Sequence, residues 1–245
     1  MNEVINTLTN HRSIRSYTGQ PVNDEDLTAI IEAFRAAPTS INGQQVTVIS
    51  VQEKETKAKI AELAGNQAWI AQAPVFLLFC ADFNRAKLAA DLRGEELVIT
   101  DGLESIIVGS TDVGIAMGNA MAAAESLGLG IVPIGGARRE PLELIKLLGL
   151  PEYVFPVCGL VVGHPTDLSA KKPRLPQAAV WHKEKYNSDL EDYIKQYDEE
   201  VSDYMKKRTN GQETRNWSQT VSSLYNRIYY PEVRKMLENQ GFNFK

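Results

Sequence analysis

The chain has 245 residues, enough to bury a full hydrophobic core as one large domain or two small ones. Hydrophobic residues make up 43% and charged residues 23%, which is typical of a soluble globular protein. The net charge of −5 argues against broad nucleic-acid binding, which needs a basic surface, but allows a local basic pocket for an anionic ligand.

The N-terminus and the cysteines indicate where the protein works. Met1-Asn2-Glu3 lacks the charged-then-apolar pattern of a signal peptide, so we expect a cytoplasmic protein. Cys80 and Cys158 each lie inside an apolar run, which predicts two buried, reduced thiols. With three histidines and no Cys-x-x-Cys motif, we expect no metal site.

Hydrophobic periodicity predicts helices and strands along the chain. Asn23 before three acidic residues is typical of a helix start. The run Val75–Ala81 is apolar on both faces and should lie in the centre of a covered sheet. The expected helices cover 2–9, 24–37, 54–63, 101–128, 140–148, 190–205 and 231–240, with another entering near Asn216. The expected strands cover 46–51, 75–81, 131–134 and 154–162.

The longest expected helix, 101–128, is mostly apolar or small. Its polar residues Glu104, Asp112, Asn119 and Glu125 fall within an arc of about 140° at 100° per residue. This pattern predicts a helix buried over most of its surface, and its charges interrupt it too often for a membrane span. Packing within a subunit or across a dimer would explain its glycines.

A short basic stretch is the first candidate ligand site. It packs two arginines, one histidine and two serines into seven residues, His11-Arg12-Ser13-Ile14-Arg15-Ser16-Tyr17. Guanidinium forks, hydroxyls and backbone N–H groups suit a phosphate-bearing ligand. A solvated basic turn would have the same composition.

Three further segments carry candidate side chains. Residues 38–45 form a polar loop of donors and acceptors, or a plain solvated connection. Gln67 and Trp69 precede the central strand and could border a ligand, although we favour a structural role for the tryptophan. The diglycine at 135–136 follows a strand and leaves backbone N–H groups free for a flat ligand. No Gly-x-Gly-x-x-Gly motif joins a strand to a helix, which disfavours a nicotinamide Rossmann domain.

Beyond Gly163 the composition changes to polar and tyrosine-rich. In the segment 171–176, two prolines hold Lys172 and Arg174 in an extended conformation that suits charges aimed at a ligand, although a solvated tail would look similar. Residues 206–211 are expected to form a basic loop. We expect residues from about 165 to 245 to form an excursion that wraps the core or a partner.

Together these motifs resemble the nitroreductase superfamily, in particular its NADPH-preferring flavin reductases and oxygen-insensitive nitroreductases. The motifs are the basic stretch 11–15, the Ala-Glu-Ser-Leu-Gly-Leu-Gly run at 124–130, the 134–136 turn with Arg138, and the segment 172–176. The resemblance implies one α+β domain over 1–245, with a central mixed β-sheet flanked by helices. It also implies a homodimer with FMN at each of two subunit interfaces.

The same resemblance implies roles for individual residues. The residues that would hold FMN are His11, Arg12, Ser13, Arg15, Ser40, Gln67, Trp69, Ile134, Gly135, Gly136, Lys172 and Arg174. Arg138 and Arg208 would bind the 2′-phosphate of NADPH, but the loop after 205 has few arginines, which leaves NADH possible. Arg15 and Lys172 would stabilise the reduced flavin, which is anionic near N1.

The implied activity is ping-pong hydride transfer from NADPH through FMN to small flat acceptors such as free flavin, quinones, nitroaromatics or azo compounds. No side-chain acid or base is needed. Two alternatives remain. One is another FMN-dependent enzyme of the superfamily, for example a dehalogenase, and the other is a flavin-binding protein without turnover. We expect no nucleic-acid or membrane partner.

Overall fold

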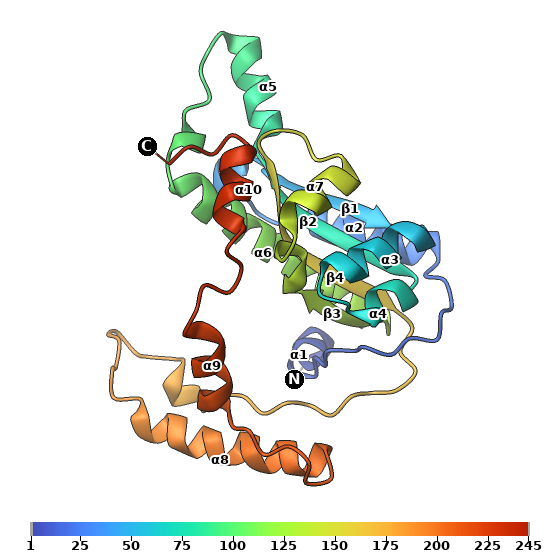
Figure 1. The fold of residues 1–245 in the computed structure, drawn as a ribbon, viewed down its shortest axis with the longest axis vertical. Coiled ribbons are helices and arrows are strands. Elements are labelled where there is room, and N and C mark those ends of the chain that lie inside the picture. The colour runs from blue at the N-terminus through green and yellow to red at the C-terminus, as the bar shows by residue number, and fades with distance from the viewer. Residues whose placement is uncertain (1, 245) are drawn as a thin grey trace. The chain divides into compact units, whose positions relative to one another are not determined.

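The computed structural model describes residues 2–244, and its centre is a four-stranded sheet (Figure 1). The strands β1 (Val46–Val51), β2 (Val75–Asp82), β3 (Gly130–Ile134) and β4 (Val154–Gly163) lie in the order β1-β2-β4-β3, and neighbours pair antiparallel. The four strands therefore form an antiparallel sheet and not the mixed sheet that the resemblance implied; an isolated parallel bridge joins Ser13 to Ile131 beside β3. The expected α+β class is confirmed.

Helices cover both faces of the sheet. Phe76, Leu78 and Cys80 of β2 pack against the first set of helices, and the alternate β2 residues pack against the second, as the two-residue period of a strand requires. The first set is α3 (Lys54–Leu63), α4 (Ala68–Gln72) and α7 (Pro141–Leu148). The second set is α2 (Asp24–Arg35), α6 (Glu104–Ser126) and α10 (Val233–Asn239). Every residue of β2 is buried, as its apolar sequence predicts.

The remaining helices are α1 (Glu3–Thr9), α5 (Asn84–Arg93), α8 (Glu191–Arg208) and α9 (Trp217–Tyr225). The sequence did not predict α4, which is short, or α5, which has no buried face and therefore no apolar period. The prediction of a basic loop at 206–211 is wrong for residues 206–208, because α8 continues through Arg208. The expected start at Asn216 is confirmed by a capping box with Gln219.

Contrary to the sequence prediction, the polar residues of the long helix α6 do not all lie on an exposed face. Asp112 is buried rather than solvated, because it bonds to a loop over α6. Apolar Ile107 is instead 60% exposed and Ile115 42% exposed. Among residues 2–244, α6 alone has the length and hydropathy of a possible membrane span, but it packs on α2 and β2 as a core helix does.

The described chain divides into two compact units. The first contains residues up to Ser169 together with the segment from Tyr230 onward, and the second is Ala170–Tyr229. The segment after Tyr230 belongs to the first unit because Met236, Leu237 and Phe242 are buried in its core. Both cysteines are free thiols; Cys80 is buried, but Cys158 is partly exposed.

Burial of Cys80 predicts a loss of stability in alkali. Burial, helped by Asp82, raises the pKa of this thiol far above its usual range. The unfolded chain releases the proton near pH 8.5 while the folded chain keeps it, so stability is complete below that pH and falls above it. We expect a loss of about 2 kcal/mol between pH 8 and pH 10 in urea unfolding. C80A should lose less over the same interval; an equal loss in both proteins would contradict this origin.

Candidate cofactor site

The basic stretch 11–17 lies along the outer edge of β3. Ile14 N–H donates to the Ile131 carbonyl at 2.9 Å, and Tyr17 bridges to Pro165. Ile14 is buried, so the extended backbone alternates and turns Ser13 and Arg15 away from the core. The polar groups of this stretch therefore sit on a fixed edge of the sheet.

His11 and Arg12 belong to the α6 end of this edge. His11 Nδ1 lies 2.7 Å from Glu125 Oε1, so a carboxylate of α6 orients the imidazole. Arg12 and Glu125 line a cavity of about 490 Å³ together with residues of α1 such as Asn6. Within residues 2–244, only Arg12 Nε and Trp69 Nε1 are buried side-chain nitrogen or oxygen atoms without a hydrogen-bond partner. Such buried donors indicate a missing acceptor.

A contact between Arg15 and Trp69 places the segment 67–69 beside the basic stretch 11–17. The Arg15 guanidinium lies 5.5 Å from the centre of the Trp69 ring, a cation–π distance. Trp69 belongs to α4, which begins directly after Gln67. The Gln67 amide donates to the Ala64 carbonyl at 2.8 Å and is thereby held at the start of α4.

The diglycine turn completes this group. A Cβ on Gly136 would lie 2.5 Å from the Ala64 carbonyl oxygen and 2.6 Å from Gln67 Nε2, so only glycine fits there. The turn 135–138 therefore packs directly on Gln67. Gly136 and Ile134 are buried, whereas Gly135 keeps some exposed surface. The structure thus joins the segments 11–15, 67–69 and 134–136, which are far apart in the sequence.

Ser40 lies in a separate, strained loop. Its backbone N–H donates to Asp112 Oδ2 at 3.0 Å, and the Gln45 amide donates to the same oxygen at 2.6 Å. Ile41, Asn42 and Gln44 all have positive φ, and the Ile41 side chain is 97% exposed. A β-branched residue with positive φ is costly, which suggests that this loop is held for a function.

The shared acceptor of this loop gives a prediction. Asp112→Ala leaves the Ser40 N–H and the buried Gln45 amide unpaired, so we expect a loss of about 2–3 kcal/mol in urea unfolding. Asp112→Asn should lose less than about 1 kcal/mol, because one amide oxygen can replace Oδ2 for both donors. Hydrogen exchange should increase at residues 38–45 in the alanine variant alone. Equal damage by both substitutions would show that charge, not the shared acceptor, holds the loop.

Arg138 is already engaged within the first unit. Its guanidinium donates to the Val157 carbonyl and lies 5.4 Å from the centre of the Tyr230 ring. Its role in binding NADPH stays a prediction.

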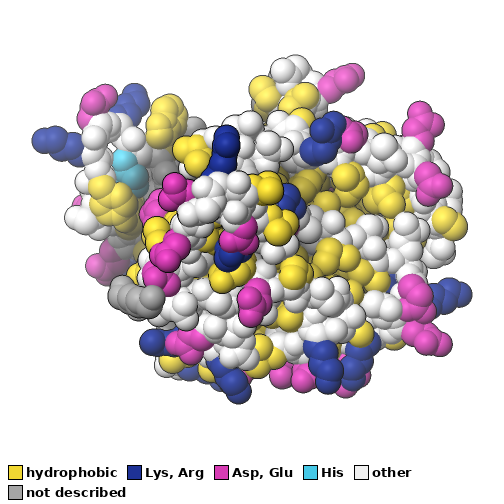
Figure 2. Space-filling view, turned by 90° about the horizontal axis from the view of Figure 1, so that it is seen from above, with side chains coloured by type: hydrophobic (Ala, Val, Ile, Leu, Met, Phe, Trp, Pro, Cys, Tyr) yellow, Lys and Arg dark blue, Asp and Glu magenta, His cyan; other side chains and the backbone are white. Residues whose placement is uncertain are grey.

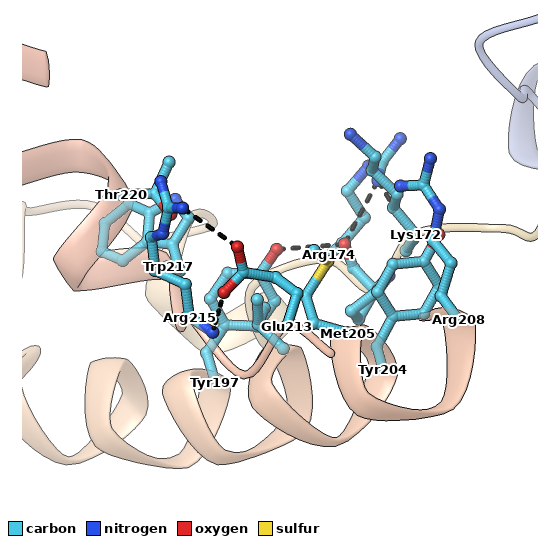
Figure 3. Close-up of a pocket in the computed structure, with 12 residues that line it drawn as sticks. Lys172, Arg174, Tyr197, Tyr204, Met205, Arg208, Glu213, Arg215, Trp217 and Thr220 are labelled. Atoms are coloured by element: carbon cyan, nitrogen blue, oxygen red, sulfur yellow. Dashed lines mark hydrogen bonds and ion pairs between the residues drawn. The ribbon is translucent and has the colours of Figure 1, made fainter. Parts of the chain in front are cut away.

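The other predicted cations, Lys172, Arg174 and Arg208, line one pocket of about 380 Å³ in the second unit (Figure 3). Its aromatic lining is Tyr197, Tyr204 and Trp217. The Tyr197 hydroxyl donates to the Pro173 carbonyl at 3.0 Å, which fixes the proline segment against α8. Sequence reasoning missed this aromatic lining, although Tyr197 and Tyr204 are seven residues apart and so share one face of a helix.

Comparison with known proteins places the chain in a family. The model described as "Nitroreductase family" matches residues 8–164, and "Nitroreductase family, C-terminal domain" matches residues 172–245. The chain is 66% identical over 245 residues to a Bacillus subtilis protein named FMN reductase [NAD(P)H], covering 99% of this chain and 98% of that protein.

Solved structures agree with this assignment. The structure of B. megaterium NfrA2 is 68% identical with a TM-score of 0.99 and covers 100% of both chains. An NADPH:FMN oxidoreductase from Vibrio harveyi complexed with NAD+ is 35% identical with a TM-score of 0.88, again over 100% of both chains. Because the two family models together span nearly the whole chain, this protein belongs to the nitroreductase family.

Proposed function

We propose that the protein is an FMN-dependent reductase that oxidises NADPH or NADH and reduces small flat acceptors such as free flavin, nitroaromatics, quinones or azo compounds. The main support is the cradle that joins 11–15, 67–69 and 134–136 in a chain 66% identical to a protein named FMN reductase [NAD(P)H]. We also propose that the enzyme is cytoplasmic.

The donors of the cradle fit FMN. A phosphate and ring carbonyls are acceptors, and Arg12 Nε and Trp69 Nε1 are buried donors in need of one. His11, Arg12 and Ser13 would hold the phosphate and ribityl chain, and Arg15 with Gln67 would face the ring edge. Bound FMN would supply the acceptance of an electron pair from the nicotinamide and its delivery to the acceptor. Lys172 and Arg174 of the second unit stay predicted partners of the same cofactor.

The positions of Ser40 and His11 support a homodimer. Ser40 is held by Asp112 and His11 by Glu125, and these acids are 13 residues apart on α6, which is about 20 Å along the helix. A second copy against the exposed Ile107 and Ile115 would cover this apolar face and bring its own loop 38–45 to the first copy's cradle.

Mixing two inactive variants tests this arrangement. Arg15→Ala damages the cradle and Ser40→Trp the loop, so a mixed dimer with the loop acting in trans keeps one intact site. Mixing after joint refolding should restore up to about a quarter of wild-type turnover. If the mixture stays as inactive as its parents although mixed dimers form, the loop serves its own chain.

An anaerobic visible spectrum before and after one equivalent of NADPH tests the function itself. We expect flavin bands that bleach, with NADH run in parallel. A colourless protein that cannot be reconstituted with FMN would contradict the proposal. A yellow protein that neither nucleotide bleaches would leave a flavin-binding protein without turnover.

A further inference from the structure

The pocket of the second unit contains one acid among its cations. Lys172, Arg174, Arg208 and Arg215 line it, and Glu213 is its carboxylate. In Figure 3, Arg215 turns toward Glu213, while Arg208 extends from the last turn of α8. Among the described residues, Arg208 makes no ion pair, so its charge is available to a ligand. Arg215 differs from it in being paired inside the pocket.

The two carboxylate oxygens of Glu213 have different hydrogen-bond partners. Oε1 accepts the backbone N–H groups of Thr214 at 3.0 Å and Arg215 at 2.8 Å, which shapes the loop after α8. Among the residues that the structure describes, Oε2 accepts a hydrogen bond only from Arg215 Nη2, at 3.0 Å. The Glu213 backbone is also fixed, because its N–H donates to Thr209 Oγ1 at 2.9 Å.

The ionisation of Glu213 agrees with this geometry. The backbone N–H of Arg215, followed by the charge of its guanidinium, lowers the pKa of Glu213 below its usual range. The carboxylate is therefore charged at neutral pH and competes with any other anion for Arg215. Both side chains are partly exposed, so their pair adds little to stability. Its effect should appear in ligand binding instead.

We propose that Glu213 limits how strongly the pocket discriminates NADPH from NADH, by holding Arg215 in an internal ion pair. The inference rests on the proposed function and on the predicted binding of the NADPH 2′-phosphate by Arg208, which lines this pocket. A 2′-phosphate carries nearly two negative charges and prefers the fork of a guanidinium. To bind Arg215 it has to displace a carboxylate already in place. NADH lacks this phosphate, so the Glu213–Arg215 ion pair does not affect its binding.

Glu213→Gln isolates the ion pair. The glutamine oxygen can still accept both backbone N–H groups in place of Oε1, while its NH2 group replaces Oε2 and cannot pair with Arg215. We expect the ratio of kcat/KM for NADPH to that for NADH to rise about three- to tenfold at low salt. Titration calorimetry with adenosine 2′,5′-bisphosphate should show a similar gain in affinity, with no gain for 5′-AMP.

Two further variants decide the mechanism. In Arg215→Gln the ratio should fall below wild type, and adding Glu213→Gln should then change nothing. Asp203→Asn is the matched control, because it removes a carboxylate that pairs with Lys206 on α8 outside the pocket. Three results would overturn the proposal: a kcat/KM ratio that does not rise in Glu213→Gln, a ratio that still rises when Arg215 is absent, or an equal rise in Asp203→Asn.

The calorimetric titration keeps this inference separate from the proposed function. It measures binding of a nucleotide phosphate and needs neither FMN nor turnover. If the wild-type protein never bleaches with NADPH, the proposed function fails, whereas the dependence of bisphosphate binding on Glu213 can still be measured. If the enzyme turns over normally but bisphosphate affinity ignores Glu213, only the present inference fails.

Discussion

Replacing Arg15 by alanine should lower FMN affinity about 30- to 150-fold, the effect of losing a charged hydrogen-bond donor worth roughly 2–3 kcal/mol. Arg15 is exposed, and within residues 2–244 its guanidinium makes a long 3.4 Å hydrogen bond to the Ser13 carbonyl and a cation–π contact with the Trp69 ring. Its donors are thus available to a ligand. Titration of apoprotein with FMN, followed by quenching of flavin fluorescence, measures the loss.

Two substitutions accompany this experiment. Arg15→Lys keeps the charge but not the planar guanidinium, so its FMN affinity should lie between those of the wild type and Arg15→Ala. Arg35→Ala removes an exposed guanidinium that pairs with Glu32, and this variant should bind FMN as the wild type does. An Arg15→Ala protein purified with its full flavin content would show that Arg15 does not bind FMN.

Phe242→Ala should destabilise the protein by about 3–5 kcal/mol, the usual cost of removing a buried aromatic ring. The ring is fully buried and lies 5.1 Å from Phe155, 5.9 Å from Phe83 and 6.5 Å from Tyr153, with near-perpendicular planes that favour all three contacts. Urea unfolding followed by circular dichroism measures the change in free energy.

Tyr225→Ala is the comparison for this substitution. The Tyr225 side chain is 73% exposed, so its removal should cost less than about 0.5 kcal/mol. A Phe242 variant as stable as the Tyr225 variant would mean that the C-terminal segment does not complete the core in solution. Phe242→Leu should recover part of the loss by filling some of the cavity.

Sequence reasoning succeeded where one local pattern decides the structure. The apolar run of β2 was sufficient to place it at the centre of the sheet, and Asn23 was sufficient to start α2. It failed where no such pattern exists. Helix α5 buries no residue; its own Leu88 and Leu92 are exposed, and so is Val98 in the segment after it. Figure 2 shows hydrophobic side chains exposed among charged ones on one face.

The site followed the same division. The segments 11–15, 67–69 and 134–136 carry recognisable chemistry, so their residues could be named from sequence. The acids that hold other parts of the candidate sites could not be named from sequence, because Asp112, Glu125 and Glu213 act through contacts that depend on the fold. Glu125 and Asp112 looked alike as polar residues of one helix. Only the tertiary structure shows that Glu125 contacts the His11 imidazole and that Asp112 accepts hydrogen bonds from the loop 38–45.

The return of the chain to the first unit after Tyr230 affects how the protein is made. A ribosome emits residues in order, so the sheet and most of its helices emerge before Met236 and Phe242 exist to cover them. Until residues 236–242 leave the exit tunnel, the nascent sheet keeps an unfilled apolar site where the Phe242 ring packs. The core is therefore completed only after the sheet has been synthesised, and a chain that stops before residue 236 exposes this surface to chaperones and proteases.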